Sequence, residues 1–181
     1  MIRPAVPSDG AAIAAVHVAA WRSAYAGLLP DWTLTELSAR RQEAYYGRVI
    51  RSGGIVHVAQ PPDDAREEEG DAPPVVGFVT ASRLPSGAIA DGEIETLYVL
   101  DDWREQGFGR GLIRAAAVDL AALGCRSVLV WVLSGNPSRW FYERLGGVRS
   151  IEGSVSVGGR LQPQTAFVWN PIDRLTAPLT E

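Results

Sequence analysis

One stretch of the chain combines a strand pattern, a glycine-rich turn and a long helix pattern, and it restricts the possible folds more than any other. Residues Glu93–Val99 have the composition of a strand and are followed by a polar connection. Residues Gly107–Leu123 then place apolar side chains at helical spacing and stop at Gly124. The next run, Ser127–Leu133, is almost continuously apolar, which is typical of a strand covered on both faces. This order predicts an α/β fold with a central sheet.

The flanking patterns predict further helices and hairpins in a single domain over residues 1–181. One helix is expected from Ser8 or Asp9 to Gly27, and a second opens with a capping box at Thr33–Glu36 and ends at Gly53. The expected order is helix, helix, hairpin, strand, helix, strand, helix, hairpin. The remaining elements are a hairpin of strands 55–59 and 75–83, a short helix over 136–146, a hairpin over 148–169 that turns at Gly158 and Gly159, and a tail over 171–181.

The charge distribution excludes several kinds of chemistry. All 17 basic residues are arginine, so a Schiff-base lysine and a phosphate-loop lysine are both ruled out. The net charge is −4, but residues 61–74 hold six acids and one arginine, and without that −5 the remainder carries +1. Residues 61–74 are therefore expected to form a flexible acidic loop, and no nucleic-acid partner is expected.

The lone cysteine and the chain's hydropathy give further expectations. Cys125 has no partner for a disulfide and lacks the spacing of a zinc site, so we expect a small buried residue and no metal. The chain has neither a signal-peptide pattern nor an apolar run of about 18 residues. These observations predict a cytoplasmic protein without a membrane partner.

The glycine-rich turn has the composition of an anion site. Arg104, Gly107 and Gly109 lie at the start of the helix, and glycines let backbone N–H groups approach a diphosphate at a helix N-terminus. Two other interpretations are a simple flexible turn and a dinucleotide-binding fold. The dinucleotide fingerprint needs G-x-G-x-x-G directly against the strand, whereas this segment reads G-x-G-x-G after a polar connection.

This segment resembles the acyl-CoA motif R/Q-x-x-G-x-G/A of the Gcn5-related N-acetyltransferase (GNAT) family, which also lies between a strand and a helix. The resemblance implies that the pyrophosphate of acetyl-CoA binds here and that the preceding strand edge hydrogen-bonds the pantetheine. The coenzyme-binding residues implied in this and the following motif are Leu97, Tyr98, Val99, Arg104, Glu105, Gln106, Gly107, Phe108, Gly109, Arg110, Asn136, Ser138, Arg139 and Tyr142.

A second motif lies directly after the buried strand. Residues 136–147 resemble the family's N-x-x-x-x-F-Y-E-x-x-G segment, with Gly147 where many members have Phe. The residues alone predict an N-cap at Asn136 and inward-packing aromatic side chains. The resemblance implies in addition that Asn136 meets the pantetheine arm and that Tyr142 protonates the leaving thiolate.

The N-terminal region has a looser resemblance to small bacterial members of the family. It implies that Trp21 and Tyr25 contact the acceptor substrate. His17 is a candidate base, although a hydrogen-bonded helix histidine is the preferred interpretation, and His57 within a strand is no stronger a candidate.

The resemblance also implies a fold and a reaction. The fold is a mixed, mostly antiparallel sheet that splays between its fourth and fifth strands, with about four helices. The reaction moves the acetyl group of acetyl-CoA to a primary amine by direct attack in a ternary complex. The acceptor would be a small amine or a protein N-terminus, and the protein a monomer or a homodimer. The alternatives are a non-catalytic acyl-CoA sensor and an NAD(P)-binding enzyme.

The catalytic base is left open between two carboxylates and a relayed water. Counting back from Arg104, Glu93 falls on the position of the general base in Gcn5-like histone acetyltransferases. Period-two alternation places Glu93 and Glu95 nominally on one face together with Leu97 and Val99, and a bulge would reverse either carboxylate. A further interpretation is that Glu93 and Glu95 are both solvated acids at the end of a strand and that neither acts as a base.

Overall fold

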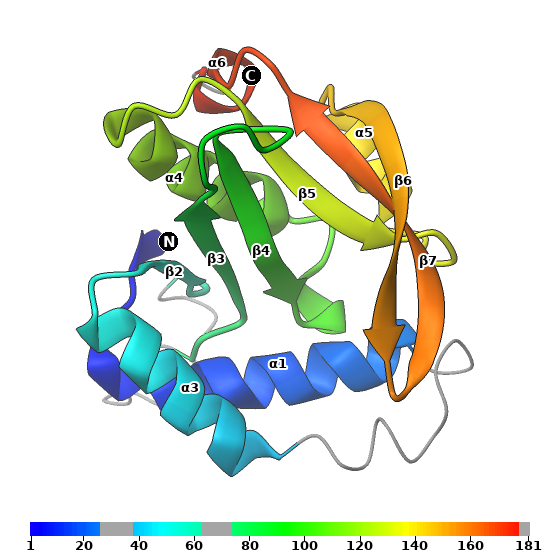
Figure 1. Cartoon of the computed structure of the whole chain (residues 1–181). Coiled ribbons are helices and arrows are strands. Elements are labelled where there is room, and N and C mark those ends of the chain that lie inside the picture. Colours follow the sequence, from blue (N-terminus) through cyan, green and yellow to red (C-terminus); the bar gives the residue numbers. More distant parts are fainter. Residues whose placement is uncertain (26–37, 63–73, 178–181) are drawn as a thin grey trace.

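The computed structural model describes residues 1–25, 38–62 and 74–177, and these form a seven-stranded sheet covered by helices on both faces (Figure 1). The strand order is β1-β2-β3-β4-β5-β7-β6. The elements are β1 (Ile2–Pro4), α1 (Gly10–Tyr25), α3 (Ala39–Arg51), β2 (Ile55–Ala59), β3 (Gly77–Arg83), β4 (Gly92–Val99), α4 (Phe108–Ala122), β5 (Val128–Leu133), α5 (Arg139–Arg144), β6 (Val148–Val157), β7 (Arg160–Trp169) and α6 (Asp173–Thr176).

Most predicted elements are confirmed within two residues of their expected bounds, but the second helix begins later. Helix α3 starts at Ala39, where the Ser38 hydroxyl accepts a hydrogen bond from Arg41 N at 3.3 Å and caps the helix. The capping box at Thr33–Glu36, residues 63–73 of the acidic loop and the end of the tail at 178–181 lie outside the described residues.

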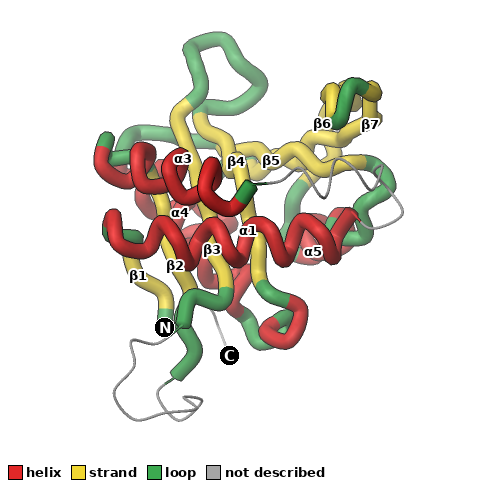
Figure 2. Tube along the Cα trace, turned by 90° about the horizontal axis from the view of Figure 1, so that it is seen from below, coloured by secondary structure: helices red, strands yellow, loops and turns green. Residues whose placement is uncertain are grey.

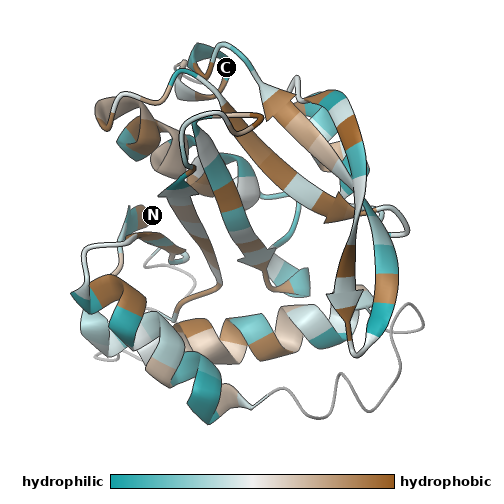
Figure 3. Cartoon of the chain, in the orientation of Figure 1, coloured by the Kyte–Doolittle hydropathy of each residue, from teal (hydrophilic) through white to brown (hydrophobic). Residues whose placement is uncertain are grey.

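The sheet has two differently covered faces (Figure 2). Helices α1 and α3 cover the face on which Val58 and Phe78 pack with Ile13 and Tyr46. Helix α4 covers the other face, where its apolar stripe contributes Leu112, Ile113, Ala116 and Leu120 to the larger core. Figure 3 shows hydrophobic residues, in brown, along the strands of the sheet and in the helices that cover it. Each fully buried leucine or isoleucine stabilises the fold by about 1.5–3 kcal/mol, so this helix anchors the sheet.

Strands β4 and β5 are parallel but pair over only part of their length. The register joins Gly92–Ile94 to Val128–Val130, while β4 continues to Val99 and β5 to Leu133. The predicted splay between the fourth and fifth strands is therefore confirmed. Beyond Ile94, the edge of β4 that faces β5 pairs with no other strand among the described residues.

The last part of the chain closes one end of the larger core. Residues Ile172 and Leu175, around the short helix α6, are buried with Leu120 and Trp169. The segment expected as a tail thus contributes core contacts up to Leu175.

Candidate functional site

The N-terminus of α4 presents free backbone N–H groups beside the open edge of β4. The first intrahelical bond runs from Gly111 N to Gly107 O at 3.0 Å. No side chain of the described residues caps this helix start. The N–H groups of Phe108, Gly109 and Arg110 therefore precede the first helical bond and point out of the helix end, which also carries the positive end of the helix dipole. This geometry suits a bound phosphate.

The two motif glycines are required for different reasons. Gly107 has φ 84°, in the left-handed region that favours glycine, and a Cβ there would meet no heavy atom within 4 Å. Gly109 lies against the short helix α5, since a Cβ there would be 3.3 Å from Cζ of Phe141. Glu105 also has positive φ, at 61°, so the loop before the helix is held in an uncommon conformation.

The other side chains of the loop are mostly tied to the protein. Arg104 Nη2 lies 2.7 Å from Asp101 Oδ1, and Asp101 also accepts a hydrogen bond from the Ser23 hydroxyl of α1. Gln106 Nε2 donates to Asp102 O at 3.0 Å. These contacts attach the loop to the end of α1, while Arg110 remains exposed at the helix start.

The second motif forms a tight turn followed by a helix shorter than predicted. Helix α5 begins at Arg139, and the Asn136 side chain caps the turn by accepting a hydrogen bond from Ser138 N at 2.9 Å. The Arg139 guanidinium lies over the Trp140 ring at 4.7 Å. Gly147 is sterically required, because a Cβ there would be 2.8 Å from Cζ2 of Trp169.

A cluster of tyrosines lies where β4 and β5 separate. Tyr142 is only 6% exposed and packs against Phe167 and Trp169, and its burial raises the pKa of its hydroxyl. Asn136 Nδ2 donates to the Tyr25 hydroxyl at 3.5 Å, and Tyr25 also hydrogen-bonds Tyr98. Burial is the main cause that raises the pKa of both Tyr25 and Tyr98. These hydroxyls are therefore protonated at neutral pH.

This cluster joins residues that were predicted separately. Tyr25 was expected at the acceptor, and Tyr98 and Asn136 at the coenzyme, but the structure brings all three together. Their link could not be predicted, because Tyr25 and Asn136 are 111 residues apart and nothing in either segment points to the other. The interaction of the Tyr98 side chain with Tyr25 was missed for the same reason.

The two candidate carboxylates lie beside a bulge in β4. Thr80 of β3 pairs with Thr96 while Ala81 pairs with Ile94, so Glu95 is an extra residue in the ladder. Glu93 pairs with Ser82, and the Glu95 carboxylate accepts a hydrogen bond from the Ser82 hydroxyl at 2.7 Å. Both carboxylates thus lie on the α1 and α3 side of the sheet.

Because of the bulge, the four residues that simple alternation placed on one face of β4 are divided between the two faces of the sheet. Leu97 and Val99 pack into the core beneath α4, on the face opposite Glu93. Glu93 is half-buried, and its pKa is raised, first by burial and then by the nearby charge of Glu95. Glu95 is exposed.

His17 is a buried histidine in an aromatic environment. Its Nδ1 and the Tyr46 hydroxyl are hydrogen-bonded at 2.8 Å, and its ring stacks on Tyr98 with the ring centroids 5.1 Å apart. Burial lowers the pKa of the imidazole to about 4. The observed contacts are those of the hydrogen-bonded helix histidine that the sequence favoured over a base.

The low pKa of His17 predicts a pH-dependent stability. Between the ordinary value of 6.5 and the folded value of about 4, the unfolded chain binds a proton that the folded chain excludes. Stability from this group is therefore complete above pH 6.5 and is lost as the pH falls towards 4. We expect protonation of His17 to lower the free energy of unfolding by about 2 kcal/mol between roughly pH 7.5 and pH 5.

Urea unfolding of the wild type and of His17→Phe, each at both pH values, isolates this contribution from those of the carboxylates. The difference in unfolding free energy between the two proteins should change with pH by this amount. A pH-independent difference would contradict the buried neutral state of His17.

Comparison with known proteins places the chain in a family. The sequence profile described as "Acetyltransferase (GNAT) family" matches residues 21–147. The chain belongs to the GNAT acetyltransferase family. It is 30% identical over 175 residues to the N-acetyltransferase YuaI of Bacillus subtilis (strain 168), covering 96% of this chain and 95% of that one.

Solved GNAT structures share the fold. A Gcn5-related N-acetyltransferase from Rhodopseudomonas palustris is 25% identical, with a TM-score of 0.66 and 94% of each chain covered. The PaiA N-acetyltransferase of Thermoplasma acidophilum, solved in complex with coenzyme A, is 14% identical, with a TM-score of 0.68 over 94% of this chain and 98% of that one. The mixed sheet and its parallel β4-β5 pair are therefore those of the GNAT fold.

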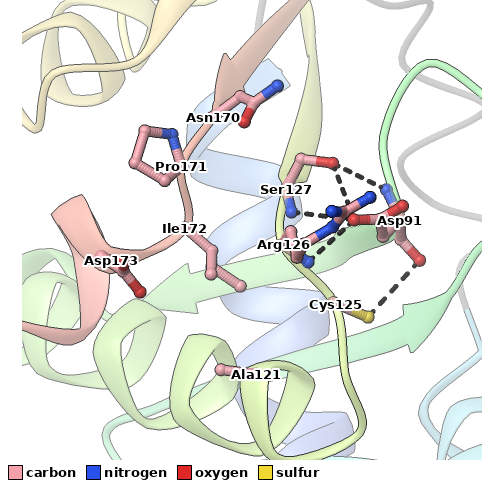
Figure 4. A pocket seen from close by; sticks show the side chains of 9 residues that line it. All are labelled: Asp91, Ala121, Cys125, Arg126, Ser127, Asn170, Pro171, Ile172 and Asp173. Atoms are coloured by element: carbon pink, nitrogen blue, oxygen red, sulfur yellow. Dashed lines mark hydrogen bonds between the residues drawn. The ribbon is translucent and has the colours of Figure 1, made fainter.

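The opposite end of this GNAT sheet holds a pocket of about 700 Å³ (Figure 4). The Asp91 carboxylate accepts hydrogen bonds there from the N–H groups of Arg126 and Ser127 and from the Ser127 hydroxyl, at 2.8, 3.1 and 3.2 Å. These bonds, together with one from Gly92 N to Ser127 O, join the start of β4 to the start of β5. The two strands are thus held together at this end and are free to diverge towards the candidate site.

Two further predicted residues have contacts away from the candidate site. His57 Nε2 pairs with Asp119 Oδ2 of α4 at 2.7 Å, and Cys125 is buried with its thiol near Asp91 O. Within residues 1–25, 38–62 and 74–177, no group of three or more His, Cys, Asp and Glu side chains is placed to hold a metal ion. None of the helices in this part of the chain has the length and apolar character needed to span a membrane.

Proposed function

We propose that the chain transfers the acetyl group of acetyl-CoA to a primary amine by direct attack. The observation that carries this proposal is the uncapped N-terminus of α4 behind Gly107, adjacent to the β5-facing edge of β4, which beyond Ile94 pairs with no strand in the described part of the chain. The helix start is suited to the diphosphate of the coenzyme. The strand edge is suited to the amide groups of its pantetheine arm.

The residues of the loop and of the strand edge would hold acetyl-CoA in these two ways. The N–H groups of Phe108, Gly109 and Arg110 would bind the pyrophosphate, and exposed Arg110 would add a positive charge. Backbone groups of Leu97–Val99 would hydrogen-bond the pantetheine as an added strand does. Ser138 and Arg139, at the start of α5 after the turn capped by Asn136, are proposed to contact the coenzyme with Asn136.

The chemistry needs one group that removes a proton and one that supplies a proton. An amine with a pKa of about 10 is mostly protonated at neutral pH and must lose a proton before its nitrogen attacks the thioester carbonyl carbon. The C–N bond forms, the C–S bond breaks and the thiolate leaves. Tyr142, whose raised pKa keeps its hydroxyl protonated, is proposed to donate the proton that the thiolate takes up.

The proposed base lies beside the bulge at Glu95. Glu93 is half-buried on the face covered by α1 and α3, whereas Glu95 is exposed and hydrogen-bonded to Ser82. A partly desolvated carboxylate with a raised pKa is a stronger base than an ordinary one. We therefore propose Glu93 as the base and Glu95 as a neighbour that raises its pKa.

Exchanging each carboxylate for its amide tests this assignment. Glu93→Gln should lower kcat/KM about 10- to 100-fold below about pH 8, where the amine is protonated, and the loss should shrink towards about pH 10. Glu95→Gln is the matched control, and it should instead shift the acidic limb of the profile to lower pH, because it removes the charge that raises the pKa of Glu93. A Glu93→Gln profile that coincides with the wild-type profile would leave a relayed water as the base.

The overall proposal is tested by measuring thiol release from acetyl-CoA across four classes of acceptor: simple amines, aminoglycoside-like amines, amino-acid analogues and peptides with a free N-terminus. We expect calorimetry to show acetyl-CoA binding at micromolar affinity or better, and at least one class to support turnover. Binding without turnover in any class would favour an acyl-CoA sensor, and no binding at millimolar coenzyme would refute both.

A further inference from the structure

One buried hydrogen-bond donor beside the tyrosine cluster has no partner. In the described part of the chain, the Trp21 indole Nε1 is a buried side-chain nitrogen without a hydrogen bond. Leaving such a group unpaired costs about 1–3 kcal/mol, and native structures contain few of them. An unpaired donor is therefore an expected place for a ligand atom.

The surroundings of Trp21 offer little to satisfy this donor. The centroid of its ring lies 4.4 Å from that of Tyr25 and 5.9 Å from that of His17, and the hydrophobic side chains that pack with it against Tyr25 are those of Ala24, Leu133 and Val157, which carry no polar atom. The polar groups of both neighbouring rings have other partners, since the Tyr25 hydroxyl accepts from Asn136 and His17 Nδ1 pairs with Tyr46.

The position of Trp21 matches the acceptor side of the proposed reaction. It lies in the last part of α1, one turn before Tyr25, which hydrogen-bonds Tyr98 of the splayed strand. Leu133 ends β5 and Val157 ends β6, so the Trp21 ring is bordered by helix α1 and by two strands beyond the splay. A substrate amine attacking at the splay would have its neighbouring atoms near this indole.

The charges nearby restrict which atom could accept the hydrogen bond. The apolar side chains of Ala24, Leu133 and Val157 that pack here carry no charge, and Glu93 and Glu95 lie on the same side of the sheet as α1. These carboxylates attract a cationic amine and repel a carboxylate group. A neutral indole N–H bordered by apolar side chains compensates the desolvation of an uncharged oxygen better than that of a carboxylate.

We propose that Trp21 Nε1 donates a hydrogen bond to an uncharged oxygen of the acceptor substrate, so that the acceptor is an amine with a carbonyl or hydroxyl group close to the amino group and an apolar side chain. A peptide-like α-amine and an amino alcohol belong to this class, whereas a free amino acid and a simple alkyl amine do not. This inference rests on the proposed acetyl transfer.

Four amines with the same branched alkyl chain provide the test. Leucinamide and leucinol carry an uncharged oxygen, leucine carries a carboxylate, and 3-methylbutylamine has no oxygen. With the wild type, we expect thiol release from acetyl-CoA to show kcat/KM about 10-fold higher for leucinamide or leucinol than for the other two, which corresponds to one hydrogen bond. Trp21→Phe keeps an aromatic ring without the donor, and it should reduce this preference to less than about threefold.

A binding measurement on the wild type covers the case in which Trp21→Phe fails to fold. With the protein saturated with CoA, the Trp21 indole N–H proton should shift downfield on addition of leucinamide but not of 3-methylbutylamine. Trp169 is the internal control, because its Nε1 already donates to Leu145 O at 2.9 Å.

Three outcomes would overturn the inference: equal kcat/KM for all four amines, a preference that survives in Trp21→Phe, or no turnover of any of the four. Calorimetry with acetyl-CoA on the same sample separates this failure from that of the proposed function. Retained coenzyme binding together with turnover of an acceptor from another class leaves the acetyltransferase proposal standing, and lost binding removes both.

Discussion

Gly107→Asp is expected to weaken acetyl-CoA binding at least about 100-fold. A Cβ at Gly107 meets no heavy atom within 4 Å, so the new side chain has room, but it lies at the helix start where the pyrophosphate is proposed to bind. Two unit charges about 5 Å apart at an effective dielectric constant of about 20 repel each other by about 3 kcal/mol, which corresponds to more than a 100-fold loss of affinity.

The matched control is Gly107→Asn, because Asn has the size of Asp and the same tolerance for the left-handed backbone at φ 84°. Both variants carry the same steric change, so the difference between their dissociation constants measures the charge alone. Titration calorimetry should show only a modest loss of acetyl-CoA affinity for Gly107→Asn. The difference in affinity between the two variants should become smaller as salt is added. Equal affinities for the two variants, with unchanged circular dichroism, would mean that no anion binds at this helix start.

Tyr142→Phe is expected to lower kcat about 100-fold while the dissociation constant of acetyl-CoA stays within about threefold of the wild type. The substitution retains the ring that packs between Phe167 and Trp169 and removes only the hydroxyl proposed to protonate the thiolate. Loss of a general acid costs about 10²–10⁴ in rate. Because the pKa of Tyr142 is raised by burial, its own ionisation should not lower kcat up to about pH 10.

Tyr46→Phe is the control for losing a buried tyrosine hydroxyl. The Tyr46 hydroxyl is hydrogen-bonded to His17, and burial raises its pKa as well. Its removal should destabilise the fold by about 1–2 kcal/mol, because an interior hydrogen bond is lost, and should leave kcat near the wild-type value. A single-turnover measurement with wild-type rate in Tyr142→Phe would return Tyr142 to a packing role.

The elements that could be predicted from the sequence are those governed by local physics. The strand at 55–59 has the predicted bounds, and the strands over 148–169 turn at the predicted glycine pair. Gly107 lies directly before α4, within one residue of the predicted helix start, because a helix start with a left-handed residue before it favours glycine whatever the rest of the chain does. Both motifs of the candidate site are also continuous segments, so their residue types and spacing were visible before any contact was known.

The arrangement of the side chains was decided by the tertiary structure. The bulge at Glu95 exists only as an offset between β4 and β3, so the alternation within β4 could not separate Glu93 from Leu97 and Val99.

The Asn136–Tyr25 contact and the unpaired Trp21 nitrogen likewise depend on where α1 crosses the open end of the sheet. Patterns along one segment report which backbone conformation its residues favour and which of its faces is apolar. Contacts between distant segments depend on register and on packing across the sheet, and neither is encoded within a single segment.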